Sequence, residues 1–408
     1  MNEQYIKTLT ERQKESCEGL ITEQEIKQAI KGMKNGKTPG SDGFPIEFYK
    51  MFWRDIGDYV IRSLNYSYSK GELSLTQKQG IITCIPKSDN REYMKNWRPI
   101  TLLNVDYKIL SSVLSLRLRQ VLKDVISQEQ KGFLAERYIG ENTRLVYDVM
   151  HHLAEKNKKG MLMLIDYEKA FDSLEWCYIE KVLEAYKFGI QFRSWFKILY
   201  TDAKSCVING GNFSSFFNLE RGCRQGDPLS PYIFILAIEP FAMAIKNSES
   251  IKGIQIKNKE YKIGQYADDT FMLLDGSESS LKETIYLLDK FSICSGLNIN
   301  ADKTQVAWLG SERYSLDRLC PHVKLKWVTS FKLLGIRFSV NLDEMLDLNF
   351  KVKLCEIEKL LCTYQKRKLS LKGKITVIKT LAIPKLIHLL SVLTSPPKSY
   401  IEKLESMF

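Results

Sequence analysis

The feature that most constrains the fold is a pair of adjacent aspartates, Asp268 and Asp269, within a predicted tight turn. The residues on both sides, 261–263 and 271–274, are rich in apolar and aromatic side chains, and we expect each segment to form a strand. The two carboxylates would then lie at the tip of a hairpin. Like charges placed side by side are unfavourable unless a cation neutralises them. The pattern therefore favours a sheet that carries a cation-binding turn.

A third carboxylate, Asp166, ends the apolar run 161–165, which is typical of a buried strand. If this strand and the hairpin are neighbours in one sheet, three carboxylates converge. Such a group suits two Mg²⁺ ions about 4 Å apart, which activate an attacking oxygen and stabilise a leaving one, as nucleotidyl transfer requires. Hard oxygen ligands also favour Mg²⁺ over zinc. An Asp-Asp pair at a turn is by itself more often a solvated loop, so the surrounding motifs decide.

Bulk composition indicates a folded protein with a basic surplus. The 408 residues include 60 Lys and Arg against 48 Asp and Glu, a net charge of +12, which favours a polyanionic partner. The nine cysteines form no C-x-x-C pair and predict reduced, intracellular thiols. The N-terminus shows no signal-peptide pattern, and the longest apolar stretch, 232–245, is too short for a bilayer, so we expect no membrane partner.

Strands and helices alternate through the middle of the chain, which predicts an α+β sheet with helices packed on one face. Expected strands and extended segments are 81–87, 97–100, 161–166, 204–209, 216–219, the hairpin 261–274 and 331–336. Expected helices are 105–126, one from about 174, 228–246 and 279–294, followed after about 345 by basic amphipathic helices. Thr22, three residues before Glu25, predicts a capping box at an earlier helix.

Two loops and one turn carry further candidate residues. In residues 221–231, Gly222 and Gly226 precede an apolar helix, and a glycine-rich loop leading into a helix N-terminus suits a phosphate or nucleotide. Alone, such a junction is more often structural. Residues 36–43 form a second loop with three glycines and a proline. Lys303 lies on a short turn, where a lysine is usually solvated but would act as a general acid if it reached a pyrophosphate leaving group.

A second aspartate, Asp172, follows Asp166 within one motif. Asp172 precedes Glu175 by three residues, a spacing that fits a capping box, and aspartate is a strong N-cap residue. We therefore interpret Asp172 as the cap of the next helix and assign only Asp166 to the metal.

Nine motifs occur in one order, and together they are far more specific than any of them alone. They are GKTPGSDG-PIEFY, IITCIPK, NWRPITLLN-DYKIL, QKGF, LIDYEKAFD, GCRQGDPLSP, YADD, GLNIN-DKT and FKLLGI. From about residue 20 onward the chain closely resembles the reverse transcriptases of non-LTR (LINE-type) retrotransposons. The resemblance implies a right-hand polymerase of fingers, palm and thumb. It also implies an RNA-directed DNA polymerase that extends a primer 3′-hydroxyl, as in target-primed retrotransposition.

The resemblance assigns catalytic roles by position. Asp166, Asp268 and Asp269 match the family's metal-binding triad, which implies two Mg²⁺ ions, with Mn²⁺ as a substitute. Lys303 matches the proposed proton donor to pyrophosphate. Phe171 matches the aromatic gate that excludes the 2′-hydroxyl of ribonucleotides.

Nucleotide-binding roles follow in the same way. Gln225 and Gly226 match the loop beside the templating base and the incoming nucleotide. Lys87 and Arg98 match basic residues of the fingers near the triphosphate, and a guanidinium binds phosphate oxygens in pairs.

The resemblance also divides the chain. It implies an N-terminal extension over 1–60, fingers with interleaved palm over 61–160, a palm over 161–344 and a partial thumb over 345–408. The loop with Lys37 and Gly40 would contact template RNA, and Gly335 lies in the strand that resembles the primer grip. The basic thumb helices would follow phosphates without reading sequence.

Family members usually carry an endonuclease domain before this region and a Cys/His-rich segment after it, and neither appears in this sequence. Two alternatives stay open. One is a catalytically silent nucleic-acid-binding remnant, which a short thumb favours and the surviving motifs oppose. The other is a group II intron or retron-type polymerase. We expect an RNA template, a DNA primer and dNTPs as partners, in a ribonucleoprotein of the nucleus and cytoplasm; no motif predicts an oligomeric state.

Overall fold

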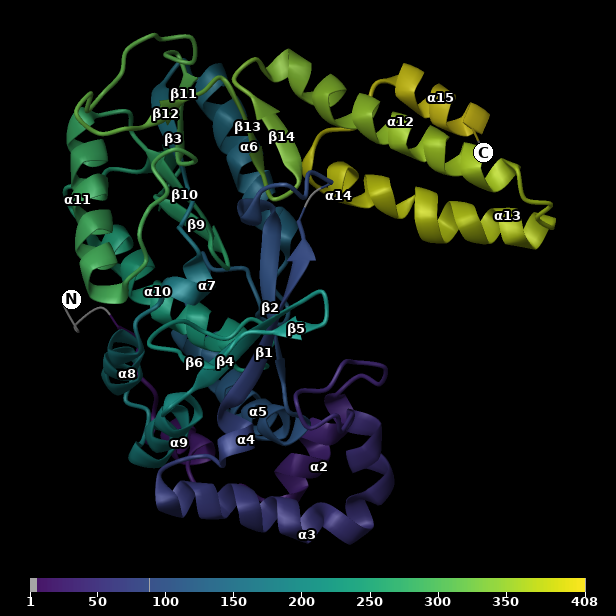
Figure 1. Ribbon diagram of the computed structural model, residues 1–408. Coiled ribbons are helices and arrows are strands. Elements are labelled where there is room, and N and C mark those ends of the chain that lie inside the picture. The colour runs from purple at the N-terminus through teal and green to yellow at the C-terminus, as the bar shows by residue number, and fades with distance from the viewer. Residues whose placement is uncertain (1–5, 88, 408) are drawn as a thin grey trace. The chain divides into compact units, whose positions relative to one another are not determined.

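The computed structural model describes residues 6–87 and 89–407, which form two compact units. Unit 1 contains the described residues up to Gln128 together with Tyr167–Asn247 and Leu287–Asn298. Unit 2 contains Glu129–Asp166, Ser248–Tyr286 and the described residues from Ile299 onward. Both units combine segments that are distant in the sequence, as the colours of Figure 1 show. The four linear domains expected from the sequence stay a prediction.

Unit 1 is organised around a mixed five-stranded sheet in the order β2-β1-β4-β5, with β6 also paired to β4. β1 runs antiparallel to β2 and parallel to β4. The strands are β1 (Gln79–Pro86), β2 (Trp97–Leu103), β4 (Lys204–Asn209), β5 (Asn212–Phe213) and β6 (Phe217–Asn218). The predicted strands at 81–87 and 204–209 are therefore confirmed.

The helices of unit 1 include two whose bounds agree closely with expectation, α5 (Val105–Val125) and α10 (Ser230–Asn247). The apolar period of α5 buries Ile109, Val113 and Leu118 completely. The other helices are α1 (Glu11–Cys17), α2 (Glu23–Gly32), α3 (Ile46–Lys70), α4 (Leu75–Lys78), α7 (Ala170–Ser173), α8 (Trp176–Ala185) and α9 (Ile190–Tyr200), with a short 3-10 turn at Met94–Asn96. Helix α11 (Glu278–Ser295) contributes residues to both units.

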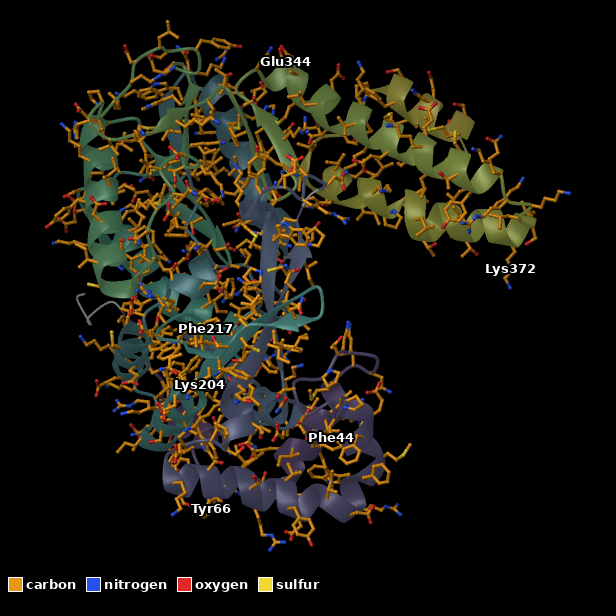
Figure 2. All side chains as sticks on the ribbon, in the orientation of Figure 1. Phe44, Tyr66, Lys204, Phe217, Glu344 and Lys372 are labelled. Atoms are coloured by element: carbon orange, nitrogen blue, oxygen red, sulfur yellow. The ribbon has the colours of Figure 1, made fainter. Side chains whose placement is uncertain are left out.

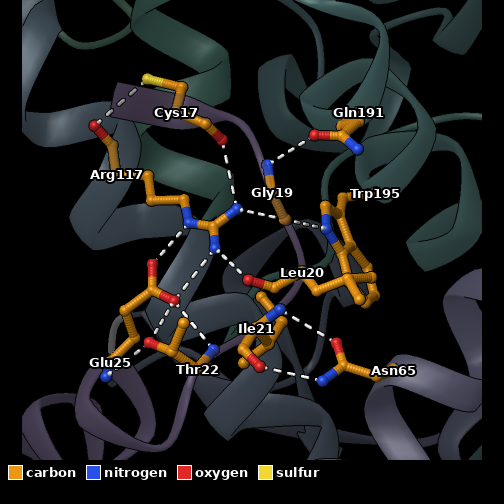
Figure 3. Close-up of polar contacts among 10 residues, drawn as sticks. All are labelled: Cys17, Gly19, Leu20, Ile21, Thr22, Glu25, Asn65, Arg117, Gln191 and Trp195. Atoms are coloured by element: carbon orange, nitrogen blue, oxygen red, sulfur yellow. Dashed lines mark hydrogen bonds and ion pairs between the residues drawn. The ribbon is translucent and has the colours of Figure 1, made fainter. Parts of the chain in front are cut away.

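A buried arginine fastens the N-terminal segment to α5. The Arg117 guanidinium donates to the carbonyl oxygens of Cys17, Gly19 and Leu20 at 3.2, 2.9 and 2.9 Å (Figure 3). It also forms an ion pair with Glu25 at 2.6 Å, and Arg117 is only 4% exposed. Glu25 accepts in turn from the backbone N–H of Thr22, which confirms the predicted capping box. Each nitrogen of the buried Arg117 guanidinium therefore donates hydrogen bonds, which compensates the cost of burying its charge.

Unit 2 contains a second five-stranded sheet, in the order β12-β11-β3-β10-β9. The central strand β3 lies between β10 and β11 and runs antiparallel to both. The strands are β3 (Lys159–Ile165), β9 (Ile263–Tyr266), β10 (Asp269–Leu274), β11 (Gln305–Gly310) and β12 (Lys326–Trp327). The predicted strand at 161–166 and the predicted hairpin at 261–274 are therefore neighbours in one sheet, which is the condition for the three carboxylates to converge.

The segment 331–336 was expected to be one strand, and this prediction is wrong. It contains the turn of a hairpin between β13 (Ser330–Leu333) and β14 (Ile336–Ser339). Leu334 and Gly335 form the turn with φ of +46° and +90°. Two successive residues with positive φ are what a tight two-residue hairpin turn requires.

The last part of unit 2 is helical, as predicted. Its helices are α12 (Met345–Gln365), α13 (Leu371–Val377) with Lys372 near its start (Figure 2), a π-helical turn (Ile378–Ala382), α14 (Pro384–Val392) and α15 (Lys398–Met407). Leu386 and Leu389 of α14 share one apolar core with α6 (Ile139–Glu155) and the sheet. A smaller hairpin pairs β7 (Ile254–Ile256) with β8 (Lys259–Tyr261).

Within the described residues, no single helix has the length and apolar composition of a membrane span. The helices Leu371–Ala382 and Pro384–Val392 meet these criteria only as a pair bent by 42°.

Candidate active site

The register of the unit 2 sheet brings the predicted carboxylates together. Thr270 pairs with Ile165 across the β10–β3 ladder. One step further, Asp269 at the start of β10 and Asp166 after the end of β3 face each other, because paired strands run antiparallel. Asp268 lies in the turn before Asp269. Sheet pairing between segments about a hundred residues apart thus places all three carboxylates at one sheet end.

The turn that carries the aspartates is held by the buried side chain of Gln130. Ala267 has a left-handed backbone with φ of +55°, which is uncommon for a residue with a side chain. The Gln130 Oε1 accepts from the Ala267 N–H at 2.8 Å, and Nε2 donates to the Ala267 carbonyl at 3.3 Å. Gly132 lies against the same turn, where an added Cβ would stand 2.4 Å from the Ala267 nitrogen. These contacts compensate the local backbone strain and fix the position of Asp268.

The three carboxylates interact electrostatically. Burial, followed by the nearby charges of Asp268 and Asp166, raises the pKa of Asp269 to about 6, although its side chain keeps access to solvent. The Lys303 ammonium lies 3.6 Å from the Asp166 carboxylate. One lysine does not balance three carboxylates, so the site has an excess of negative charge.

The 300–304 turn is bonded directly to Asp166. The Asp166 N–H donates to Oγ1 of Thr304 at 3.3 Å, and its carbonyl accepts from the Asn300 N–H at 2.7 Å. Lys303 is therefore positioned by the backbone of the residue whose carboxylate it faces.

Charge and ligand chemistry at this sheet end fit a divalent cation. Carboxylate oxygens are the ligands that Mg²⁺ prefers, and the excess negative charge favours a cation of high charge. Among residues 6–87 and 89–407, no three His, Cys, Asp or Glu side chains are grouped closely enough to hold a metal ion. The assignment of Asp166, Asp268 and Asp269 as metal ligands therefore stays a prediction supported by ligand type and charge.

In unit 1, the glycine-rich loop is bonded to the segment that contains Phe171. The Cys223 N–H donates to the Phe171 carbonyl at 2.6 Å. Gly222, with φ of +86°, leaves no room for a Cβ, which would lie 2.7 Å from the Asp172 carbonyl oxygen. The Phe171 ring stacks on the fully buried Phe234 with centroids 4.4 Å apart. The predicted gate residue and the predicted nucleotide-binding loop are therefore held together within one unit.

The same loop is bonded to β2. The Thr101 N–H donates to the Gln225 carbonyl at 2.7 Å. Gly226 has φ of +121°, and a Cβ there would lie 2.5 Å from the Thr101 carbonyl oxygen. Glycine is required at this close approach of two backbones.

Lys87 and Arg98 lie at the same end of the β1–β2 hairpin. Arg98 pairs with Ile85 in the ladder, and the Lys87 N–H donates to the Asn96 carbonyl at 2.7 Å. Both side chains are exposed. Two solvent-exposed basic side chains at one end of the hairpin are consistent with the predicted contacts to phosphate.

The predicted cap role of Asp172 is wrong. Asp172 lies inside the short helix α7, and the next helix, α8, begins after Glu175 without a side-chain cap. The Asp172 carboxylate instead accepts from Nε2 of Gln225 at 3.3 and 3.2 Å. A local spacing pattern was overridden by a contact across 53 residues.

The loop that contains Lys37 and Gly40 is fastened to Asn104. An added Cβ at Gly40 would lie 2.0 Å from Oδ1 of Asn104, and the same oxygen accepts from the Ser41 hydroxyl at 3.3 Å. Lys37 is exposed. Gly335 lies in the β13–β14 turn, beside the contact of 2.9 Å between His388 and the Leu334 carbonyl.

Sequence reasoning assigned no role to Gln130 or Asn104. Both lie in motifs that carry the family resemblance, QKGF and NWRPITLLN. The motifs therefore marked the two positions but did not indicate what the side chains do. Only the folded chain shows that each uses a buried carboxamide to hold a distant loop.

Comparison with known proteins identifies the relatives of this chain. A family model described as reverse transcriptase (RNA-dependent DNA polymerase) matches residues 85–338. The chain is 31% identical over 407 residues to the transposon TX1 uncharacterized 149 kDa protein of Xenopus laevis, covering 97% of this chain and 30% of that protein. It is 22% identical over 407 residues to the RNA-directed DNA polymerase from mobile element jockey of Drosophila funebris, covering 94% of this chain and 42% of that protein.

Among solved structures, telomerase from Candida albicans in complex with a telomeric RNA fragment aligns with a TM-score of 0.45 and 12% identity, over 89% of this chain and 62% of that one. The chain spans less than half the length of the two curated relatives.

Proposed function

Since this chain belongs to the reverse transcriptase family of RNA-dependent DNA polymerases, we propose that it adds deoxynucleotides to the 3′-hydroxyl of a primer on an RNA template. The observation that carries the proposal is the sheet register that sets Asp166 beside Asp269, with Lys303 3.6 Å from Asp166. An α+β sheet with carboxylates at one end is the arrangement that the right-hand polymerase fold implies.

Reverse transcriptases generally use divalent metal ions, and we propose Mg²⁺, with Mn²⁺ as a substitute. Asp166, Asp268 and Asp269 would hold two ions. When bound, the ions would supply Lewis acidity at the attacking and leaving oxygens.

The remaining chemistry is proposed for this chain's own side chains. Lys303, held by the turn bonded to Asp166, would give a proton to the leaving pyrophosphate. Arg98 and Lys87 would bind the triphosphate. Phe171, supported by its stack on Phe234, would lie under the sugar and exclude a 2′-hydroxyl.

The proposed partners are an RNA template, a DNA primer and dNTPs. The net charge of +12 supports binding to phosphates, with Lys37 and Gly40 near the template and Gly335 near the primer. Because the relatives are proteins of mobile elements, we place this activity in target-primed retrotransposition, within a ribonucleoprotein of the nucleus and cytoplasm.

The proposal is tested by extension of an oligo(dT) primer on poly(rA) with dTTP and Mg²⁺. We expect extension that EDTA abolishes. Binding of the primed template without extension at any Mg²⁺ or Mn²⁺ concentration would contradict the proposal and favour a silent nucleic-acid-binding protein.

A further inference from the structure

A pocket of unit 1 is lined by residues from α3, α4 and the start of α5 and includes no residue of the candidate active site. Its volume is about 390 Å³, within the range of pockets that bind small molecules, roughly 300–1,000 Å³. Ile56, Val60 and Leu64 follow one another at intervals of four along α3 and give the pocket an apolar side. Gln77 and Asp106 add a carboxamide and a carboxylate. The pocket therefore suits a flat apolar group that also carries hydrogen-bond donors.

The Asp106 carboxylate is held by a donor at each oxygen. The Tyr107 N–H donates to Oδ1 at 2.7 Å, and Nε2 of the buried Gln77 donates to Oδ2 at 2.8 Å. An ionised carboxylate has about four acceptor sites, so acceptor sites remain for a ligand. Burial raises the pKa of Asp106 against the effect of these two hydrogen bonds, and a ligand that donates further hydrogen bonds would favour the ionised form.

The exposed ring of Tyr59, which lines the pocket, already carries a cation. The Arg62 guanidinium lies 5.0 Å from the centroid of this ring and 2.8 Å from the Asp58 carboxylate. Exposed ion pairs of this kind are weak, so a phosphate could replace Asp58 as the partner of Arg62. A cationic ligand would be repelled by Arg62, whereas a neutral ring with an attached phosphate would be attracted.

The pairing of an aromatic ring with a cation recurs seven residues further along α3. Tyr66 is exposed (Figure 2), and the Lys70 ammonium lies 5.4 Å from the centroid of its ring. Residues seven apart lie on one face of a helix, about 10 Å apart along its axis. Rings for bases and cations for phosphates, repeated along one surface, are typical of proteins that bind single-stranded RNA.

We propose that this pocket binds a guanine base of single-stranded RNA, with the N1–H and the 2-amino group donating to Asp106 and the adjoining phosphates near Arg62 and Lys70. Guanine is the RNA base whose Watson–Crick edge presents two adjacent N–H donors, which is what a carboxylate accepts. Its flat faces suit the apolar side of the pocket and the Tyr59 ring. This binding needs no metal ion and no dNTP, so it is independent of the proposed polymerase activity.

The test compares two RNA pentamers, UUGUU and UUIUU, in which inosine replaces guanosine and lacks only the 2-amino group. Their binding to the full chain is measured by fluorescence anisotropy in EDTA without dNTPs. Binding at other RNA-contacting surfaces is the same for both pentamers and cancels in the ratio. We expect UUGUU to bind about tenfold more tightly, the order of effect of one hydrogen bond to a charged group.

Asp106→Asn should remove this preference, because asparagine keeps the size of the side chain but has a single acceptor oxygen. The matched control is Asp124→Asn. Asp124 also lies on α5 and accepts from the Nε2 of a glutamine, Gln13, at 2.7 Å, but does not line the pocket. The Asp124→Asn variant should bind UUGUU and UUIUU with the unmodified ratio.

Tyr59→Ala tests the same pocket at an exposed position, where the substitution does not disturb the core. Both pentamers should bind at least about fivefold more weakly, because stacking on the ring is lost, while their ratio is retained. Tyr314→Ala is the control in unit 2. It removes an exposed ring with the Arg313 guanidinium 5.1 Å from its centroid and should leave both affinities unchanged.

Equal affinities for UUGUU and UUIUU in the unmodified chain, or a preference that survives Asp106→Asn, would overturn the guanine pocket. GMP that competes as tightly as UUGUU would assign the pocket to a free nucleotide instead of RNA. Capped arginine, whose guanidinium carries a similar pair of donors, would assign it to a basic peptide if it displaced UUGUU more effectively than GMP does. Either result would overturn the proposal. A chain that shows the expected preference but does not extend a primer would contradict the proposed function alone.

Discussion

Gln130 holds Ala267 by both ends of its carboxamide, accepting from the Ala267 N–H at 2.8 Å and donating to its carbonyl at 3.3 Å. Gln130 is fully buried, and the two residues are 137 positions apart. This pair determines where the adjacent Asp268 lies. The geometry of the candidate active site therefore depends on a neutral side chain that takes no part in the chemistry.

Gln130→Glu should destabilise the protein and lower its polymerase activity. A carboxylate cannot donate to the Ala267 carbonyl, so a buried acceptor faces a buried charge at an expected cost of about 1–3 kcal/mol. Thermal unfolding and primer extension measure the two effects. Gln255→Glu, on the exposed side of β7, is the control, and equal behaviour of the two variants would contradict the role of Gln130.

Phe171→Ala should admit ribonucleotides, because removal of the ring opens space for a 2′-hydroxyl. We expect the preference for dTTP over UTP to fall by at least about tenfold, the order of effect of reshaping an apolar pocket. Single-nucleotide incorporation measures the ratio. Phe216→Ala removes an exposed ring of the same unit and should leave it unchanged. Unaltered sugar discrimination in Phe171→Ala would remove Phe171 as the gate.

Cys17 should resist alkylation in the native protein. Burial raises the pKa of its thiol to about 11, whereas the pKa of an ordinary thiol is about 8.5. At pH 8.5, iodoacetamide should label the exposed Cys177 and leave Cys17 unmodified until the protein is unfolded.

The same pKa shift links stability to pH. Because the folded state binds the Cys17 proton more tightly than the unfolded state, its contribution to stability is complete below about pH 8.5 and declines as pH rises toward about 11. Rapid labelling of native Cys17 at pH 8.5 would show that the packing around Arg117 is incorrect.

Periodicity and motif order were sufficient to predict the elements that carry the carboxylates. Strand 161–166 and hairpin 261–274 were expected from the apolar pattern alone. Their adjacency was a condition for the convergence of Asp166, Asp268 and Asp269, and the β3–β10 register of the folded chain meets that condition. The apolar pattern of each segment is a local property of the sequence, and residues with strong strand preference make it easy to recognise.

Side-chain contacts between distant segments could not be read in this way. Asp172 has the spacing of a helix cap, yet a partner 53 residues away fixes its role. The 331–336 segment is apolar enough for one strand, but two positive φ values at Leu334 and Gly335 turn it into a hairpin. In both cases tertiary contacts override the local preference, and a single sequence does not reveal them.

The most direct test of the account is dTTP incorporation on primed poly(rA) by the unmodified chain and by Asp268→Asn, with binding of the primed template measured in parallel. Asp268→Asn keeps the size of the side chain and removes one charge from the proposed metal site. The account predicts that incorporation is abolished while the duplex is still bound with the same affinity. Incorporation by Asp268→Asn at the unmodified rate would contradict the assignment of the aspartates as the catalytic centre.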